Sequence, residues 1–581
     1  MSAPLARVAA AALACAACTR PLPNWPVTET GKPLADWDSS RARRAPPVAR
    51  TVTAERIRRA REAEPHNWLT YYGGYDAWRH SPLAQVTRAN VATLRTAWTF
   101  QFSPLGLTPS PQAYSLEAAP IVVDGVMYVT GFEGYVWALD AATGRLLWQY
   151  QHSIPIDVAL CCGNVNRGAA VAHGLVLFAT LNGQLVALDA ETGARRWQVP
   201  FADVRAGESA TGAPLVVKEL VLVGASGGVY GTRGHLDAFD VRTGRRAWRR
   251  YTVPKPGEPG SETWSGDAWA RGGGATWITG SYDPELDLVY WGTGNPGPLF
   301  DGRVRPGSNL YTSGMVALDP DDGTIRWHYQ WTPHDVWDYD GTNENILLDL
   351  GGRKLLAHFD RNGHLFILDR TNGALVRVQR FGSRVTWGTI DSLTGRVTPQ
   401  RVPTPEGTEI CPGPAGAKEW PHATWSPRTR LLYVPTIEDG CAKYTLGPTR
   451  FREGLAYFGG EADARAHPPR GAVKAYDPAT GRLAWEWRSP YPVVASLLST
   501  AGDLVFVGEA DGHLNALDAH TGAPLWRTNT GNGIHSNPVA YAVGGRQYVA
   551  VPNGWGGWID GYAPQLFGAK RGTAVHVFAL P

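Results

Sequence analysis

The sequence contains little methionine, little cysteine and little net charge, with 3 Met, 6 Cys and a formal charge of +3 in 581 residues. Because positive and negative side chains are interspersed, the charge pattern gives no indication of a nucleic-acid partner. Beyond the first twenty residues, no apolar stretch is long enough for a transmembrane helix. Glycine, proline and tryptophan are plentiful, at 67, 44 and 24 residues. This composition is typical of an all-β fold with short strands and many turns.

The first twenty residues have the pattern of an export signal. Arg7 precedes a short alanine-rich run that contains Cys15 and Cys18 and is too short to span a bilayer. A cysteine after small residues also suits a bacterial lipid-attachment site, although Ala or Cys, not Leu, stands three positions before each candidate. We expect residues 1–20 to be a signal peptide or lipoprotein signal and 21–66 to be an N-terminal extension. The protein would then be periplasmic and would touch the membrane only through a lipid anchor.

Four cysteines remain after this segment: Cys161, Cys162, Cys411 and Cys441. An even number in an exported protein implies two disulfides, and three pairings are possible. The simplest joins the adjacent pair to each other and Cys411 to Cys441. Adjacent α-carbons lie about 3.8 Å apart, below the usual disulfide span, so such a bond is strained. For an arbitrary Cys-Cys pair, two buried thiols are the simpler interpretation.

A repeated pattern, Ala-x-Asp-x-x-Thr-Gly-x-x-x-Trp, predicts a series of β-hairpins. A hydrophobic strand ends at the Asp, the Thr-Gly turn supplies a positive-φ residue, and the next strand carries the Trp. The Asp positions, including two looser copies, are Asp140, Asp189, Asp240, Asp319, Asp369, Asp477 and Asp518.

The spacing of these repeats predicts a closed ring. Most copies lie about 40–50 residues apart, which is typical of a β-propeller with four strands per blade. Seven visible copies and one degenerate copy, expected between Asp369 and Asp477, suggest an eight-bladed β-propeller with tryptophan-docking repeats. The C-terminal segment 575–580 and the early segment Thr96-Ala-Trp98 would complete one blade and close the ring. A propeller alone does not determine a function.

The Trp repeat together with Cys161-Cys162 resembles the quinoprotein alcohol dehydrogenases, which use pyrroloquinoline quinone (PQQ). The resemblance runs from about Asn67 to the C-terminus and implies a single propeller domain over 67–581. Cys161-Cys162-Gly-Asn-Val-Asn-Arg167 is similar to a family loop in which a disulfide between adjacent cysteines covers one face of PQQ and the Arg pairs with a carboxylate of PQQ. Cys411 and Cys441 fall where the family has its second disulfide.

Further motifs resemble the rest of the family's cofactor site. Trp277, after three glycines, matches the residue that covers the other face of PQQ, although alone it would be one more blade-packing Trp among 24. A planar tricarboxylate needs cationic groups at its rim and flat surfaces on its faces. The remaining implied contacts with PQQ are Glu117, Thr211, Ser226, Gly227, Gly228, Arg361, Lys418 and Trp555.

The segment from Trp331 to Gly341 contains Asp338 and Asp340 on either side of a tyrosine. Carboxylates of this kind suit a hard cation, although an Asp-rich surface turn would look similar. The resemblance implies that Asp338 is the catalytic base and that Arg361 hydrogen-bonds both this base and the reactive quinone oxygens. It implies a metal site of Asn295, Asp338 and Asp340. Asp340 matches the extra carboxylate of the lanthanide-dependent branch, so we expect either Ca²⁺ or a lanthanide.

Three positions depart from the family pattern. Val229 stands where the family has a metal-binding Glu, and this loss opposes the argument for a lanthanide. Glu419 stands where alcohol-type relatives often have Asn, and its charge would be unfavourable beside a carboxylated quinone. Leu299 stands where methanol oxidisers have a bulky Trp, and this smaller residue suggests a larger or different substrate.

These observations favour a periplasmic enzyme that oxidises a small-molecule alcohol to an aldehyde, with hydride transfer to PQQ. The chain has no Cys-x-x-Cys-His haem motif, so we expect a separate electron acceptor such as a soluble cytochrome c. Two alternatives remain. The first is a PQQ-binding propeller with impaired or lost catalysis, and the second is a non-enzymatic scaffold of the outer-membrane assembly type.

Overall fold

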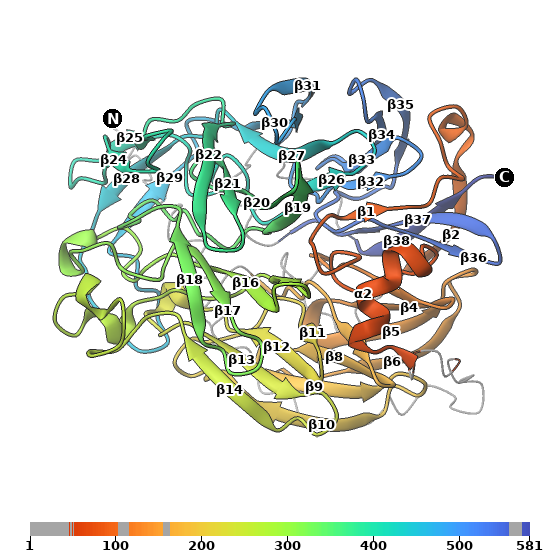
Figure 1. Ribbon diagram of the computed structural model, residues 1–581, viewed down its shortest axis with the longest axis horizontal. Helices are drawn as coiled ribbons and strands as arrows, with labels where there is room; N and C mark the ends of the chain where they lie inside the picture. The colour runs from red at the N-terminus through yellow and green to blue at the C-terminus, as the bar shows by residue number, and fades with distance from the viewer. Residues whose placement is uncertain (1–45, 47–48, 50, 103–114, 155–162, 557–571) are drawn as a thin grey trace, which may run out of the picture.

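A computed structural model describes residues 46, 49, 51–102, 115–154, 163–556 and 572–581. Nearly all of its regular structure is β-strand, and successive sheets follow one another around the molecule (Figure 1). Within the described residues there are seven four-stranded sheets and one five-stranded sheet, together with two smaller ones. Eight large sheets agree with the eight blades expected from the repeats.

The first four large sheets are each built from four consecutive strands. They are β3 (Ile121–Val123), β4 (Val126–Thr130), β5 (Tyr135–Asp140) and β6 (Leu146–Gln151); β7 (Ala170–Ala172), β8 (Leu175–Ala179), β9 (Gln184–Asp189) and β10 (Arg195–Pro200); β11 (Leu215–Val217), β12 (Leu220–Gly224), β13 (His235–Asp240) and β14 (Arg246–Tyr251); and β15 (Ser281–Asp283), β16 (Leu288–Thr293), β17 (Gly314–Leu318) and β18 (Ile325–Gln330).

The next three large sheets have the same antiparallel order, and in one of them two strands of a smaller sheet are inserted between the second and third strands. They are β19 (Ile346–Leu350), β20 (Arg353–Phe359), β21 (His364–Asp369) and β22 (Ala374–Arg380); β26 (Thr424–Ser426), β27 (Leu431–Glu438), β30 (Arg470–Tyr476) and β31 (Leu483–Ser489); and β32 (Leu498–Thr500), β33 (Leu504–Gly508), β34 (His513–Asp518) and β35 (Pro524–Asn529), to which β1 (His80–Ser81) adds a parallel edge strand.

The last sheet joins the two ends of the described chain. Strand β2 (Arg95–Gln101) pairs with β38 (Ala574–Ala579), which continues into β37 (Arg546–Asn553) and β36 (Val539–Val543). Trp98 lies opposite Val577 in this pairing. The prediction that early and late segments share one blade is therefore confirmed, and the sheets close into a ring.

Each repeat also ties its sheet to the next. The indole N–H of Trp148 donates to Ala190 O at 3.0 Å, and its ring packs on Gly193, the turn glycine of the following repeat. A Cβ on Gly193 would lie 2.7 Å from that ring, so the tryptophan requires a glycine there. Trp98, Trp197, Trp248 and Trp485 make the same kind of contact. The repeat therefore specifies the spacing between blades as well as the hairpin itself.

The long gap between Asp369 and Asp477 holds no extra blade, which corrects one expectation from the repeats. This segment, described throughout, contains the two smaller sheets instead. A Thr-Gly turn after Asp391 sits in a two-stranded hairpin, where it resembles a repeat without belonging to a large sheet. The smaller strands are β23 (Gly388–Ile390), β24 (Val397–Pro399), β25 (Thr408–Ile410), β28 (Ala442–Leu446) and β29 (Gly460–Asp463).

Helices are few and short in the described chain. Among the described residues the one α-helix is α2 (Ala54–Ala63), capped by the Thr53 side chain, and its Ile57 and Ala60 join the buried apolar cluster of the first four large sheets. No helix in the described chain has the length and apolar character to span a membrane. The 3₁₀ turns are η3 (Val91–Thr93), η5 (Phe132–Gly134), η6 (Gly228–Tyr230), η7 (Ser261–Thr263), η8 (Ala268–Arg271) and η9 (Gly302–Val304).

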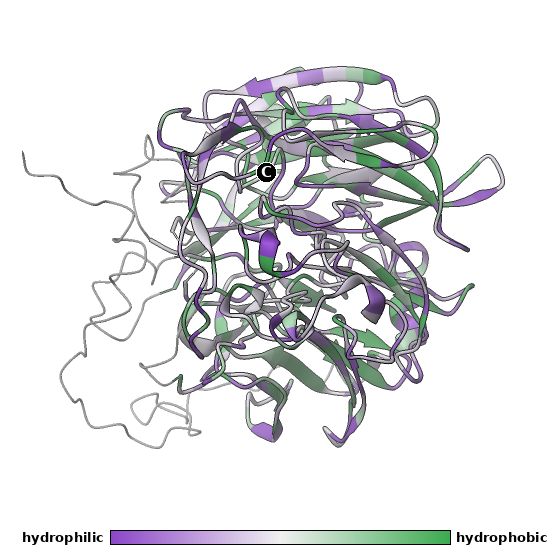
Figure 2. Ribbon diagram, turned by 90° about the vertical axis from the view of Figure 1, so that its left-hand side faces the viewer, coloured by the Kyte–Doolittle hydropathy of each residue, from purple (hydrophilic) through white to green (hydrophobic). Residues whose placement is uncertain are grey.

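The core is formed by apolar strand residues, which follow the strands as green segments in Figure 2. Cys411 and Cys441 form a disulfide, as predicted. Cys161 and Cys162 lie outside the described residues, as does the 1–20 segment.

Candidate active site

A pocket with about 780 Å³ of empty space, part of it open to solvent, lies where loops from successive sheets meet. The residues that line the pocket come from two kinds of loop in the sheets that contribute: the loop just before the first strand, and the loop between the second and third strands. Asp338 precedes β19, for example, and Arg361 joins β20 to β21. Within the described chain the lining residues are Val165, Arg167, Thr211, Ser226, Gly227, Gly228, Val229, Ala275, Trp277, Asn295, Asp338, Asp340, Arg361, Pro414, Ala415 and Glu419.

Arg167 and Glu117 form a buried ion pair at one end of the pocket, with 2.7 Å between Nη2 and Oε2. The Arg167 guanidinium also lies over the rings of Trp277 and Trp420, 4.9 and 4.7 Å from their centroids. Burial raises the pKa of Glu117 to about 7, although Arg167 acts in the opposite direction. This end therefore presents a cation on a flat aromatic surface.

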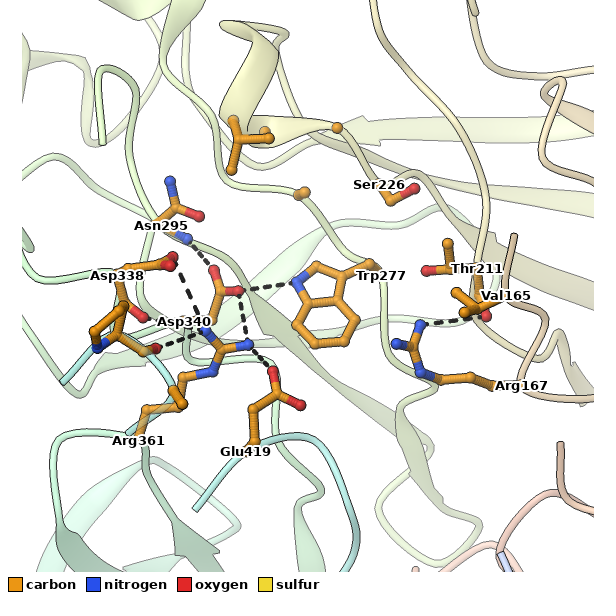
Figure 3. A pocket seen from close by; sticks show the side chains of 16 residues that line it. Val165, Arg167, Thr211, Ser226, Trp277, Asn295, Asp338, Asp340, Arg361 and Glu419 are labelled. Atoms are coloured by element: carbon orange, nitrogen blue, oxygen red, sulfur yellow. Dashed lines mark hydrogen bonds and ion pairs between the residues drawn. The ribbon is translucent and has the colours of Figure 1, made fainter. Parts of the chain in front are cut away.

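The other end of the pocket brings Asp338, Asp340 and Arg361 together (Figure 3). Arg361 Nη1 donates to Asp338 O at 3.2 Å and lies 3.9 Å from Asp338 Oδ1, while its Nη2 is 3.5 Å from Asp340 Oδ2. The Trp277 indole N–H donates to Asp340 Oδ2 at 3.1 Å, and the Asn295 backbone N–H donates to Oδ1. Asp338 has φ of 70°, in the left-handed region that non-glycine residues rarely adopt outside turns and functional sites.

Glu419 is a second anionic partner of Arg361. Its Oε1 forms a short ion pair with Arg361 Nη2, and its Oε2 accepts the backbone N–H of Trp420 at 2.6 Å. Burial raises the pKa of Glu419, and Arg361 opposes this shift. Three carboxylates thus surround one guanidinium at this end of the pocket.

The structure brings most of the residues singled out in the sequence into this one pocket. Three described candidates lie behind its surface: Glu117 beneath Arg167, Lys418 bound to Glu344, and Trp555 buried beside Val494 and Ala510. Their contact with a cofactor stays a prediction, as does that of Cys161 and Cys162, which are not described.

Lys418 belongs to a buried network that was not predicted from the sequence. Its Nζ lies 2.9 Å from Glu344 Oε2 and 3.1 Å from Glu419 O, and Glu344 also contacts His422 at 3.1 Å. Burial raises the pKa of Glu344, but Lys418 and His422 outweigh it and bring the value to about 2. This network supports the loop that carries Glu419 into the pocket.

Asp335 is a second residue whose role emerges only from the structure. Its carboxylate accepts the backbone N–H groups of Trp337 and Tyr339 at 2.8 and 2.9 Å and the Ser313 hydroxyl at 2.8 Å. It thereby fixes the turn on which Asp338 stands. Its place in the same motif as Asp338 was the available signal, but spacing alone does not separate a supporting carboxylate from a reacting one.

Leu299 is 4% exposed and packs in an apolar cluster with Trp337 and Tyr339, and it is not among the lining residues. The sequence argument that it enlarges a substrate pocket therefore has no contact to support it within the described chain.

The donor set of the pocket fits a planar anion and a hard cation. Trp277 offers a flat face between the guanidinium groups of Arg167 and Arg361 (Figure 3). Oxygen donors for a cation come from Asp338, Asp340 and the Asn295 amide, whose N–H₂ is already used on Pro296 O. Val229 contributes no ligand atom.

Residues 68–380 match the family described as "Glucose/ethanol/alcohol dehydrogenase, beta-propeller domain". The chain belongs to this family. Residues 416–561 also match the description "Outer membrane protein assembly factor BamB". That segment contains the Asp477 and Asp518 copies of the Trp repeat.

Several relatives in this family are similar to the chain along most of their length. The chain is 37% identical to quinoprotein alcohol dehydrogenase PedH of Pseudomonas putida, over 89% of this chain and 91% of that protein. It is 40% identical to a lanthanide-dependent methanol dehydrogenase of Methylacidiphilum fumariolicum, over 86% of each. Among solved structures, a europium-containing methanol dehydrogenase superposes with a TM-score of 0.83 at 37% identity, covering 90% of this chain and 99% of that one.

Proposed function

We propose that this protein is a periplasmic quinoprotein that oxidises an alcohol to an aldehyde, using PQQ and one metal ion, Ca²⁺ or a lanthanide. The observation that carries the proposal is the pocket itself, which joins Arg167, Trp277 and Arg361 to the carboxylates of Asp338 and Asp340. The family membership and the full-length similarity to alcohol and methanol dehydrogenases support the same assignment.

In this proposal the two ends of the pocket hold different groups. Trp277 would cover one face of PQQ, and Arg167 would pair with one of its carboxylates. Polar contacts with PQQ would come from four further residues that line the pocket: Thr211, Ser226, Gly227 and Gly228. Asn295, Asp338 and Asp340 would hold the cation. When bound, PQQ supplies a quinone that accepts a hydride, and the cation polarises its carbonyl.

Asp338 is the proposed general base. Its side chain is 18% exposed, so a substrate hydroxyl can reach it, and Arg361 Nη1 lies 3.9 Å from its Oδ1. Asp338 would take the hydroxyl proton of the alcohol, and the quinone of bound PQQ would supply the acceptor for the hydride of the carbinol carbon, which leaves the aldehyde. A soluble cytochrome c is the proposed partner that would receive the two electrons.

A second candidate function is a PQQ-binding propeller with impaired or lost catalysis. The specific observation in its favour is Val229, which lines the pocket without a ligand atom where the family pattern has Glu. The proposed export of the chain is common to both candidates.

Reconstitution separates these possibilities. Purified protein is loaded with PQQ and either Ca²⁺ or La³⁺, and dye-linked oxidation of a series of primary alcohols is followed. The proposal predicts turnover with at least one metal. Bound PQQ without turnover under either condition would support the second candidate, and absence of PQQ binding would leave the non-enzymatic scaffold.

A further inference from the structure

Glu419 is the pocket carboxylate for which the family resemblance supplies no role. It is 5% exposed and is held at both oxygens. Arg361 Nη2 contacts one of them (Figure 3), and the Trp420 backbone N–H donates to the other. Lys418, which binds the Glu419 carbonyl, anchors the same residue from behind. A carboxylate fixed in this way is a built part of the site.

Glu419 and Asp340 compete for the same nitrogen of Arg361. Nη1 of Arg361 is directed to the carbonyl oxygens of Asp338 and Pro414, at 3.2 and 3.3 Å. Nη2 stands between Glu419 Oε1, which it contacts closely, and Asp340 Oδ2, which is 3.5 Å away and beyond a good hydrogen bond. Without the Glu419 carboxylate, Asp340 would be the nearest anion for Nη2, and an ion pair there would oppose metal binding by Asp340.

The negative charge of Glu419 should also favour cation binding at this end of the pocket. At the Arg361 end, the carboxylates of Asp338, Asp340 and Glu419 face a single guanidinium, whereas Arg167 at the other end is matched by Glu117. An uncharged residue at 419 would leave two carboxylates against Arg361. Val229 has removed one anionic ligand that the family pattern supplies, and Glu419 restores one negative charge nearby without having to ligate the ion.

We propose that Glu419 is a positioning residue for the cation site. By holding Arg361 it leaves Asp340 to the metal, and its charge compensates for the absence of a carboxylate at Val229. This inference rests on the proposed function, because it takes Asn295, Asp338 and Asp340 as the cation ligands.

The test measures cation binding directly, without turnover. Tb³⁺ is titrated into purified protein, with and without PQQ, and its luminescence is excited through tryptophan, since Trp277 bonds to Asp340. Ca²⁺ affinity is obtained by competition. We expect Glu419→Gln to weaken Tb³⁺ binding by at least about tenfold, and Ca²⁺ binding by a smaller factor, since Coulomb attraction scales with the charge of the ion.

Matched variants separate this effect from general damage. Asp283→Asn removes another buried carboxylate that pairs with an arginine, Arg370 at 2.6 Å, but does not line the pocket, and it should bind Tb³⁺ like the wild type. Val229→Glu should tighten Tb³⁺ binding, and adding it to Glu419→Gln should recover most of the lost affinity. Thermal unfolding followed by circular dichroism verifies that each variant is folded.

Equal Tb³⁺ affinity in wild type, Glu419→Gln and Asp283→Asn would overturn the inference, and so would a wild type that binds no Tb³⁺. PQQ binding, followed separately by quenching of tryptophan fluorescence, tests the proposed function instead. A protein whose Tb³⁺ affinity depends on Glu419 but that does not bind PQQ would contradict that function while supporting the role of Glu419.

Discussion

Two buried arginine–glutamate pairs stand on either side of Trp277, and they differ in what surrounds the glutamate. Glu117 is fully buried beneath Arg167, with Oε2 2.7 Å from Arg167 Nη2. Glu419 lines the pocket and shares Arg361 with Asp338 and Asp340. The first pair presents a balanced cation to an anionic ligand, and the second leaves an excess of negative charge where a cation and a base are proposed. Similar residue pairs thus serve opposite electrostatic purposes.

The largest effect is expected from a substitution that changes only the Arg361 end of the pocket. Asp338→Asn should lower alcohol turnover by about 10²–10⁴-fold, because the amide cannot accept the hydroxyl proton. Asn tolerates the left-handed backbone of this position, so the fold should be retained. Dye-linked oxidation measures turnover, and tryptophan quenching verifies PQQ binding. Full activity in this variant would show that Asp338 is not the base.

The Arg167 end should respond in affinity for PQQ. Arg167→Gln should weaken PQQ binding by about 2–5 kcal/mol, because a buried charge pair to the ligand is lost. Glu117, whose pKa burial raises to about 7, can take up a proton near neutral pH and so need not remain as an unpaired charge. Arg361→Gln serves as the comparison, with a smaller loss of affinity by fluorescence titration. Equal losses would remove the distinction between the two ends.

The support behind Glu419 can be tested through stability. Glu344→Gln should reduce the free energy of unfolding at pH 7 by about 3 kcal/mol, since it leaves Lys418 buried without its carboxylate partner. Because the folded pKa of Glu344 is about 2, below the usual 4.5, its stabilisation is present above pH 4.5 and is lost as pH falls toward 2. The variant should lack this acid dependence in urea unfolding measured across that range. An unchanged pH profile would contradict the assignment.

The smallest effect is expected from the contacts between blades, which support both ends of the pocket. Trp148→Phe removes the indole bond to Ala190 O and should cost about 1 kcal/mol in unfolding free energy. Since this contact lies between blades, PQQ and Tb³⁺ affinities should both stay at wild-type values. A selective loss at one end would indicate that blade spacing tunes the pocket.

Much of the fold follows from the repeat because its interactions are local or between neighbours. The Asp–Thr–Gly turns form within single hairpins, and most of the repeat tryptophans pack on the turn glycine of the next copy, as Trp148 does on Gly193. The distance between copies in the sequence therefore sets the distance between blades. The same regularity misled the expectation between Asp369 and Asp477, since Asp391 forms the same turn in a hairpin that belongs to no blade. Turn chemistry is specified locally, whereas membership of a blade depends on distant strand pairing.

By itself, the sequence determined the propeller and its closure through Trp98, because hydrophobic periodicity and turn residues act over short distances. The residues of the pocket were expected from the family resemblance. Only the tertiary structure decided how the charges pair. Arg361 and Glu419 lie 58 residues apart, and Arg167 and Glu117 come from different loops, so their contacts depend on where the ring brings each loop. In the sequence Glu419 was an unfavourable charge near a quinone; in the folded protein it is the partner of Arg361.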